Sequence, residues 1–498
     1  MKKRILALFL VGIMVLLPLF GCNKSEDKSH SKTDEVTTRS EGVVADDGLR
    51  YDSDGYLMDD IPDDLKFNSA EIQVLHWTEA EIMEFDTKED TAFAIEREIY
   101  LRDREVESRL DVSFKWIGTK GHWNSLDSFL STVQQAMLSG ERYDIIATYS
   151  QTAGVLAFNG LLTELQSNKY MDLSKPWWPD SLTESFTVGG KLYFASGDLS
   201  STFLSQMIGV FFNKEYFPDQ DLYDLVYDGE WTIDTMFTLA KDRYVDLDED
   251  TTKSNLDQYG VVVPWYVYLD GFFYGCNLIT VDRDSEGDLR VSNSYIGERA
   301  DTLTETLQTF FHKTNDGYHT QTSETVTLFA RGGSAFMVAP GVVVLTNSAL
   351  RDTDVDYGVL PMPKYNTQQE KYKTVTTNLI SLYGIFAGST EEEIDRAGAV
   401  LECLGSSGYR GLAPVLFNEC LKLRYAKDGD TGKMYDIIRE GVVFDVGRVY
   451  AVSLDGITQD AWQRTVIFND GVWGAKAGGI DAQLQALLDQ LQDSFDER

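Results

Sequence analysis

Apolar positions in the first half of the chain switch between the spacing of strands and the spacing of helices. Residues 126, 129, 130, 133, 137 and 138 are apolar, which predicts a helix over Leu126–Leu138. A second helical pattern covers Ala92–Leu110. Strand-like runs lie before, between and after these helices, at Glu71–Trp77, Asp111–Ile117 and Tyr143–Thr148. This alternation predicts an α/β protein with a largely parallel sheet covered by helices.

Ligands of such proteins bind at the carboxyl ends of the strands. The loops after Trp77 and after Thr148 are therefore the candidate ligand loops of this region. Further along, two β-rich runs at Lys191–Ser196 and Met207–Asn213 are joined by a short polar stretch, 197–202. This pattern is typical of a chain that leaves one lobe and enters another.

Several segments resemble one known family in the same order along the chain. They are Gly-Gly-Lys-Leu-Tyr followed by Val-Phe-Phe-Asn-Lys-Glu-Tyr-Phe within Ser185–Phe217, the run from Trp231-Thr232 to Asp257-Gln-Tyr-Gly260, Phe329–Met337, and Asp356–Pro363. Together they resemble extracellular solute-binding proteins, the maltose-binding-like receptors of carbohydrate ABC importers. The resemblance covers about residues 71–410.

The resemblance implies a periplasmic-binding-protein-like fold with two discontinuous α/β lobes and a hinge. It places 67–198 and 360–405 in lobe 1, and 205–355 and 406–498 in lobe 2, with the hinge near 195–208 and 355–363. It also implies a receptor that closes over a small ligand, an oligosaccharide by resemblance, and delivers it to an ABC permease. We expect a monomer without enzymatic activity.

The amino terminus has the pattern of a secretory signal. A basic start, Met1–Arg4, precedes the apolar run Ile5–Phe20, which is shorter than the roughly 20 residues of a spanning helix. Leu19-Phe20-Gly21-Cys22 resembles a lipobox. We therefore predict a lipoprotein signal peptide over 1–22, an acylated Cys22 and an acidic flexible tether over 23–66. The alternative is an ordinary signal peptide with an incidental cysteine.

These features predict a location on the outer face of the bacterial cytoplasmic membrane, held there by the lipid anchor alone. The charge composition then limits the classes of ligand and partner that the protein can bind. The chain has 80 acidic and 44 basic residues and a formal net charge of −36. Nucleic-acid binding requires clustered basic residues, so this charge excludes it. It weakly favours a neutral or cationic ligand.

Sugar binding needs flat apolar faces and planar polar groups. We select residues at strand ends, at the crossing and in the carboxyl-terminal region, although any of the aromatic ones could instead belong to the core. The predicted ligand-binding residues are Trp77, Thr78, Tyr149, Ser150, Asp198, Trp265, Tyr266, Tyr274 and Trp473.

An acidic loop has part of the spacing of a calcium-binding loop. Asp246, Asp248, Asp250 and Asp257 fall at positions 1, 3, 5 and 12, but Thr251 stands where the turn favours glycine. We expect either a weak structural calcium site or a solvated loop, and no required cofactor.

Three other functions stay open. A receptor of the same fold could bind a peptide or a polyamine, and the acidic charge would suit a cation. A lipid-anchored glycoside hydrolase would need two carboxylates about 5–10 Å apart. A surface adhesin would need no small ligand. The sequence contains neither a Gly-x-Ser-x-Gly elbow nor a His-Glu-x-x-His motif.

Overall fold

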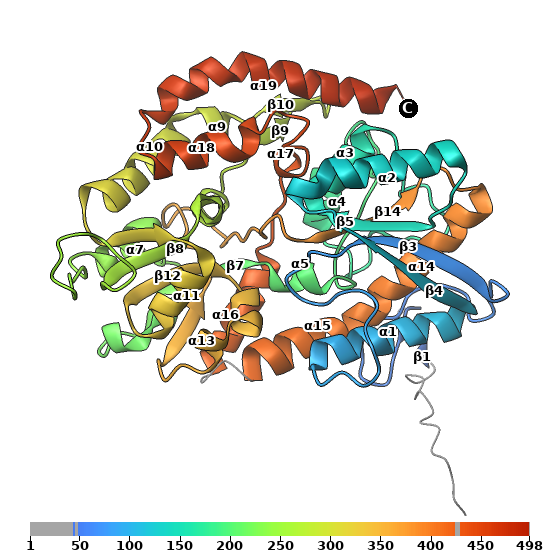
Figure 1. Cartoon of the computed structure of the whole chain (residues 1–498), viewed down its shortest axis with the longest axis horizontal. Helices are drawn as coiled ribbons and strands as arrows, with labels where there is room; N and C mark the ends of the chain where they lie inside the picture. The colour runs from blue at the N-terminus through green and yellow to red at the C-terminus, as the bar shows by residue number, and fades with distance from the viewer. Residues whose placement is uncertain (1–42, 45–47, 424–428, 498) are drawn as a thin grey trace, which may run out of the picture. The chain divides into compact units, whose positions relative to one another are not determined.

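The computed structural model describes residues 43–44, 48–423 and 429–497 (Figure 1). These described residues belong to one compact unit. The predicted signal peptide, Cys22 and most of the predicted tether therefore lie outside the described part of the chain. Within that part, no helix is both long and apolar enough to cross a membrane.

The first lobe is built on a five-stranded sheet. The strand order is β4 (Val112–Thr119), β3 (Ala70–Trp77), β5 (Ile145–Tyr149), β14 (Ser381–Phe386) and β6 (Leu162–Thr163). β3 runs parallel to β4 and β5, whereas β14 runs antiparallel to β5 and β6. Every residue of β5 and β14 is buried, as expected for central strands covered on both faces. The alternation of strands and helices predicted this lobe correctly.

Helices cover this sheet, and the longest begins with a strong local signal. They are α1 (Ala94–Leu110), η1 (Trp123–Ser125), α2 (Leu126–Ser139), α3 (Ser150–Phe158), α4 (Asp180–Phe186) and α14 (Glu391–Arg410). A capping box of Thr390 and Glu393 starts α14, which packs against α1. The boundary predicted after residue 405 falls inside this helix. Arg410 still contacts Glu105 of α1 at 2.9 Å.

The second lobe has its own five-stranded sheet. The order is β11 (Gly317–Thr320), β8 (Tyr259–Pro264), β12 (Ser334–Pro340), β7 (Ile208–Asn213) and β13 (Tyr357–Leu360). β8 is parallel to β11 and β12, and β7 is antiparallel to β12 and β13. Its helices are η2 (Lys214–Tyr216), α6 (Leu222–Tyr227), α7 (Ile233–Ala240), η3 (Tyr266–Leu269), α8 (Asp270–Gly275), α11 (Thr322–Ala330), α12 (Val342–Thr346) and α13 (Ser348–Arg351).

Two of the segments that connect the lobes run side by side, and residues 441–443 pair with the second of them at Thr374. The chain enters the second lobe through α5 (Ser201–Ser205) and returns through residues 361–380. The amide of Ile208 donates to the carbonyl of Val375 at 2.9 Å, and the amide of Thr377 donates to the carbonyl of Gln206 at 2.9 Å. The predicted strand Lys191–Ser196 is not regular. It forms two isolated bridges, Lys191 with Val188 and Ala195 with Tyr383 of β14.

Most of the remaining elements form a third layer that contacts both lobes. They are β9 (Val281–Arg283), β10 (Leu289–Val291), α9 (Asn293–Ile296), α10 (Glu298–Gln308), η4 (Thr309–Lys313), α17 (Val446–Val449), α18 (Ile457–Ile467) and α19 (Trp473–Asp496). Three others, α15 (Leu412–Pro414), η5 (Val415–Leu423) and α16 (Gly429–Glu440), pack on one another, and α15 and α16 lie on the opposite side of the molecule in Figure 1. The sequence predicted a largely helical end of the chain, all of it in lobe 2. This holds for α16, which packs on β13 of the second lobe, but α17 packs on α3 of the first lobe.

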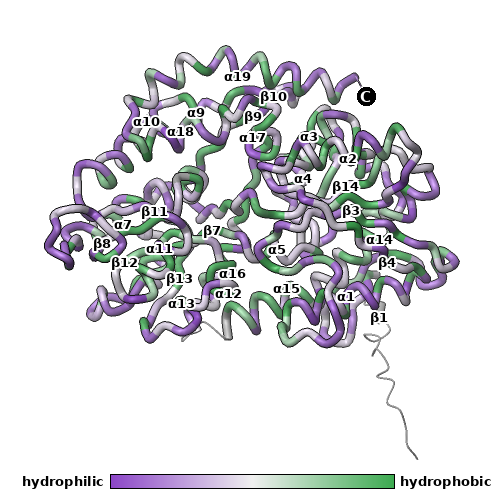
Figure 2. The backbone as a smooth tube through the Cα atoms, in the orientation of Figure 1, coloured by the Kyte–Doolittle hydropathy of each residue, from purple (hydrophilic) through white to green (hydrophobic). Residues whose placement is uncertain are grey.

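The last helix, α19, runs along the top of Figure 1. Hydrophobic and hydrophilic residues alternate along it (Figure 2), as expected of a helix with one buried face. Its start packs on α9 and α10. Its end reaches the first lobe, where Lys191 Nζ donates to the carbonyl of Phe495 at 2.8 Å.

The described end of the predicted tether is part of the folded unit. β2 (Arg50–Tyr51) pairs with β1 (Val43–Val44). Asp59 is buried and accepts from Arg109 of α1 at 2.6 and 2.7 Å, and Ile61 is also buried. The tether prediction therefore does not hold for residues 48–66. Their few apolar side chains pack on the first lobe, which a count of acidic residues does not show.

Candidate functional site

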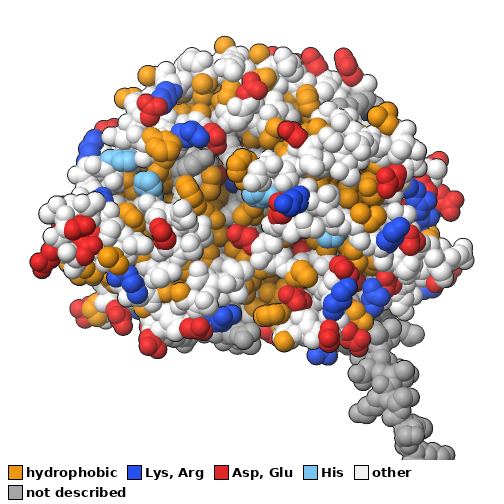
Figure 3. Space-filling view, in the orientation of Figure 1, with side chains coloured by type: hydrophobic (Ala, Val, Ile, Leu, Met, Phe, Trp, Pro, Cys, Tyr) orange, Lys and Arg blue, Asp and Glu red, His pale blue; other side chains and the backbone are white. Residues whose placement is uncertain are grey.

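A cavity of about 690 Å³ lies where the two lobes and the third layer meet. Its size suits a small molecule. It is lined by His122, Trp123, Tyr149, Gln151, Trp265, Val267, Tyr268, Thr377, Asn378, Leu379, Arg448, Ala451, Val452, Gly456, Gln459, Asp460 and Arg464. Tyr149 ends β5 and Trp265 follows β8 directly, so the cavity lies at carboxyl ends of strands in both sheets. Hydrophobic side chains gather along the hollow in the middle of the face drawn in Figure 3.

Two tryptophans, one from each lobe, expose large parts of their side chains at this cavity. Trp123 of η1 is 63% exposed and Trp265 is 48% exposed. Exposed aromatic surface of this kind marks binding sites. Trp265 also has a φ of +46°, which is rare for a bulky residue and costs about 1–3 kcal/mol. Strain of this kind concentrates at functional sites.

Tyr149 and His122 form the wall next to Trp123. Their ring centroids are 5.2 Å apart. The Tyr149 hydroxyl lies 3.3 Å from Gln151 Oε1 and donates to it. Burial raises the pKa of Tyr149 well above its usual value, so the hydroxyl stays a neutral donor.

Arg448 holds three parts of the cavity wall together. Its Nη1 donates to the carbonyl of Thr376 on the crossing segment at 2.7 Å, and its Nη2 pairs with Asp270 of α8 at 2.9 Å. Burial raises the pKa of Asp270, and Arg448 and Gln463 oppose that shift. The pair thus offers the cavity donors without a free positive charge.

Amide side chains supply planar polar groups. Gln151 of α3 donates to Gln459 of α18 and, at 3.4 Å, to the carbonyl of Arg448. Asn378 lines the cavity from the crossing segment. Amides of this kind can donate to and accept from hydroxyl groups.

A glutamate outside the cavity fixes the loop that carries the exposed tryptophan of the first lobe. Glu79 Oε2 accepts from the amides of Gly121 and His122, both at 2.8 Å. Two residues on, Glu81 accepts from Gln206 of the crossing segment at 2.7 Å. The segment after β3 thus connects the aromatic wall to the crossing.

Among the residues predicted from the sequence, Tyr149 and Trp265 line the cavity. Thr78, which follows β3, is exposed but does not line the cavity. Its amide donates to the carbonyl of Thr119 at 3.0 Å. Ser150 is buried and donates to the carbonyl of Asn378 at 2.8 Å. Tyr266 begins η3, but its side chain lies outside the described part of the chain.

The other predicted aromatic residues are buried in packing and do not line the cavity. Trp77 donates to Ser381 Oγ at 2.8 Å and lies 5.8 Å from Tyr149, behind the cavity wall. Tyr274 donates to Asp445 Oδ2 at 2.9 Å. Trp473, the first residue of α19, donates to the carbonyl of Tyr295 at 2.6 Å. Their positions correct the prediction, because neither a strand end, as for Trp77, nor an aromatic run or a place in the carboxyl-terminal region shows which way a side chain points.

Asp198 also lies away from the cavity. It is buried and accepts two hydrogen bonds from Arg439, both at 2.8 Å. Burial raises the pKa of Asp198 to about 6, and Arg439 opposes the shift. Its role is to hold the start of the crossing segment to α16 rather than to contact a ligand.

Sequence reasoning missed the exposed Trp123, the buried Arg448 and Glu79. Only Trp123 gave a signal, because it follows Gly121-His122 in a polar loop between predicted elements. Arg448 lies far from the other lining residues in sequence, so only the fold brings it there.

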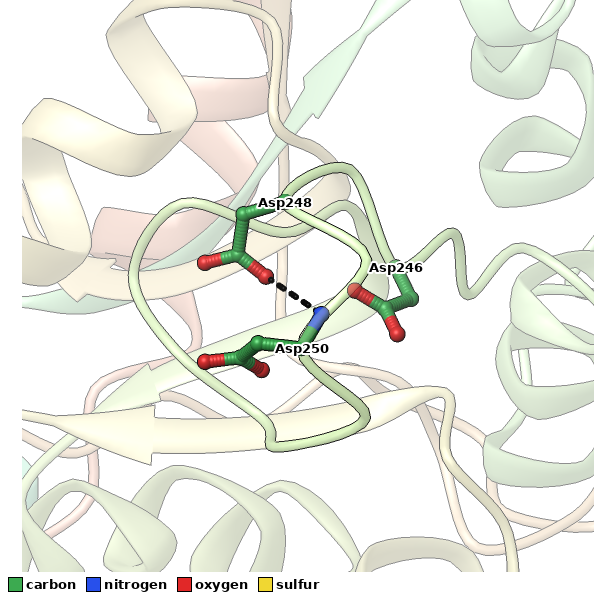
Figure 4. A group of neighbouring side chains, drawn as sticks. All are labelled: Asp246, Asp248 and Asp250. Atoms are coloured by element: carbon green, nitrogen blue, oxygen red, sulfur yellow. Dashed lines mark hydrogen bonds between the residues drawn. The ribbon is translucent and has the colours of Figure 1, made fainter.

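The acidic loop brings three carboxylates together. Oxygens of Asp246, Asp248 and Asp250 lie within 4.8 Å of one another (Figure 4). Asp257, the fourth predicted ligand, is buried instead, and its oxygens accept from the amides of Leu247 and Ser254 at 3.1 and 3.0 Å. Calcium binding at the other three stays a prediction.

Comparison with protein families identifies the class. The model of the family "bacterial extracellular solute-binding protein" matches residues 114–410, more than half of the 498 residues. The chain therefore belongs to this family, which consists of binding proteins. A search of curated proteins found no match.

Solved structures show the same fold at low sequence identity. UgpB from Mycobacterium tuberculosis, in complex with glycerophosphocholine, has a TM-score of 0.54 and 13% identity, with 85% of this chain and 99% of that chain covered. The GacH receptor of Streptomyces glaucescens GLA.O has a TM-score of 0.53 and 13% identity, with 84% and 99% covered. A cyclo/maltodextrin-binding protein complexed with maltotetraose has a TM-score of 0.51 and 15% identity, with 85% and 96% covered. The predicted family and two-lobed fold are thus confirmed.

Proposed function

We propose that this protein is an extracellular receptor that binds an oligosaccharide in the cavity between its lobes and delivers it to an ABC importer. The observation that carries the proposal is the pair of exposed tryptophans, Trp123 and Trp265, one from each lobe, at a single cavity. Flat aromatic faces suit the C–H surfaces of sugar rings, and Gln151, Gln459 and Asn378 suit hydroxyl groups. Two of the solved structures with this fold have related ligands, maltotetraose and acarbose.

The charge of the cavity favours a neutral ligand over a polyamine. Asp460 is the one carboxylate among the described lining residues, and it lies 3.6 Å from Arg464. The whole chain is acidic, but the wall of this cavity is not. A peptide receptor would still be compatible with the amides and aromatic rings.

The same count weighs against a glycoside hydrolase. That chemistry uses two carboxylates about 5–10 Å apart. The described wall offers Asp460 alone, and Asp270 behind it is paired with Arg448. The described wall therefore favours a binding site over the active site of a glycoside hydrolase.

Closure of the two lobes on the ligand would give the receptor two states. The two crossing segments that run side by side are the proposed hinge. A ligand that contacts Trp123 and Trp265 together binds the closed state better and so shifts the population toward it.

Isothermal titration with a panel of maltodextrins, other oligosaccharides, peptides and polyamines tests the proposal. We expect one glycan class to bind, and Trp123→Ala and Trp265→Ala each to weaken its binding by about tenfold to a hundredfold, if a sugar ring stacks on tryptophan with an energy similar to the roughly 1–3 kcal/mol of a stacked nucleobase. Leu138→Ala is the control, because Leu138 is 88% exposed and does not line the cavity. Saturable binding of a polyamine without any glycan binding would contradict the proposed ligand.

We also propose that an acylated Cys22 anchors the receptor to the outer face of the cytoplasmic membrane as a monomer. The lipobox-like sequence before Cys22 supports this. Labelling of cells with a palmitate analogue should mark the protein, and Cys22→Ala should abolish the label. Release of an unlabelled native protein into the medium would indicate an ordinary signal peptide instead.

A further inference from the structure

A second cavity of about 650 Å³ lies in the second lobe, where the crossing segment leaves it. We call it the basic pocket. Its wall combines three cationic side chains, Arg299, Lys371 and Lys373, with the amide side chains of Asn277 and Asn366. None of these residues lines the cavity that holds Trp123 and Trp265.

The charge of the basic pocket is opposite to that of the chain. The chain has 80 acidic and 44 basic residues. Among the described residues, no ion pair joins Arg299, Lys371 or Lys373 to a carboxylate. Glu370 is the single described carboxylate of the wall. Three cations without a described carboxylate partner around one cavity repel one another and attract an anion.

Hydrogen bonds already hold the wall in place. The Arg299 guanidinium lies 4.6 Å from the centroid of the Tyr365 ring, and its Nη2 donates to the carbonyl of Cys276 at 2.8 Å. Gln369 Nε2 donates to the carbonyls of Gly275 and Lys371 at 2.8 and 2.9 Å. The loop that carries the lysines is therefore tied to the end of α8, so an anion would find its donors in position.

We propose that the basic pocket binds a compact oxyanion, a phosphate or carboxylate group on a small molecule. Arg299 would offer its remaining N–H groups, and Lys371 and Lys373 would supply positive charge. The amides of the wall would add neutral donors. The pocket joins Arg299 of α10 to the loop that returns to the first lobe, so an occupied pocket would stiffen the second crossing segment.

Isothermal titration of the purified protein at low ionic strength, with inorganic phosphate and separately with citrate, tests the proposal. We expect saturable binding of at least one of them. The double variant Lys371→Gln, Lys373→Gln should weaken that binding by about tenfold or more, since one hydrogen bond to a charged group contributes about 1.5–3 kcal/mol. Arg299→Gln alone should weaken it as well.

Lys433→Gln is the matched control. It removes the same charge at an exposed lysine that pairs with Asp430 at 2.8 Å. Phosphate binding alone would assign a phosphate site, and citrate binding alone would assign a carboxylate site. The proposal would be overturned if neither anion bound saturably, or if Lys433→Gln weakened anion binding as much as the double variant does. Titration with oligosaccharide tests the other cavity, so the proposed glycan site and the proposed anion site can be confirmed or rejected separately.

Discussion

The two cavities have nearly the same volume, about 690 and 650 Å³, but different walls. The first presents exposed tryptophans and amides, and its buried arginine is neutralised by Asp270. The basic pocket presents cations without described carboxylate partners. The difference shows that the net charge of the chain does not describe the wall of each cavity. A chain of formal charge −36 carries a nearly neutral site and a positive one.

Ionic strength should separate the two cavities most strongly. Salt screens interactions between exposed charges, and the Debye length falls from about 30 Å at 0.01 M to about 10 Å at 0.1 M. Between 10 and 200 mM sodium chloride we expect phosphate affinity to fall roughly tenfold or more and glycan affinity to change less than about twofold. Titrations of both ligands across this range measure it. An equal loss of affinity for both ligands would contradict the proposed difference in charge between the two cavities.

Glu79 tests whether the aromatic wall depends on support from outside the cavity. Glu79→Ala removes the acceptor for the amides of Gly121 and His122 and should weaken glycan binding by about tenfold, since charge-assisted hydrogen bonds contribute about 1.5–3 kcal/mol. Glu79→Gln keeps an acceptor oxygen and should recover part of the affinity. Phosphate affinity should not change in either variant. A loss of phosphate binding would instead indicate a general effect on folding.

Asp198 should change stability with pH and leave both ligands unaffected, because it lines neither cavity. Burial raises its pKa to about 6, above the ordinary value of 3.8, so the folded state binds the proton more tightly than the unfolded state does. This contribution is complete below about pH 4 and is lost as pH rises through about 6, up to roughly 3 kcal/mol. Chemical denaturation from pH 4 to 7 measures it.

Asp198→Asn should remove that part of the pH dependence. A variant whose unfolding free energy follows the same pH curve as the native protein would show that the carboxyl group is not the source. Unchanged glycan affinity in the variant would confirm that Asp198 supports the crossing and not the ligand.

The smallest effect is expected at the acidic loop, where only three of the four predicted ligands converge. Millimolar calcium should raise the melting temperature by no more than a few degrees, since weak binding stabilises a fold only by the logarithm of the occupancy. Asp248→Asn should remove the increase, and magnesium should serve as the control ion. A shift that survives in Asp248→Asn would place the calcium elsewhere.

The fold was more predictable than the site. Apolar spacing predicted the α/β region of the first lobe, and the resemblance of local segments such as Trp231–Gly260 to solute-binding proteins implied the two lobes and their crossing. Trp77 and Trp265 both follow or end a strand, yet Trp77 is fully buried and Trp265 is 48% exposed. The direction of a side chain depends on neighbours from distant segments, such as Ser381 for Trp77. The end of the chain was misplaced for the same reason.

The C-terminal helix α19 links the two lobes in addition to the segments of the chain that cross between them. It starts on α9 and α10 and ends where Phe495 meets Lys191 and Tyr193 of the first lobe. Any rotation of the lobes must either carry this helix along or break those contacts at its end. The speed at which the cavity opens and releases its ligand would then be set partly at the last residues of the chain, far from every group that touches the ligand.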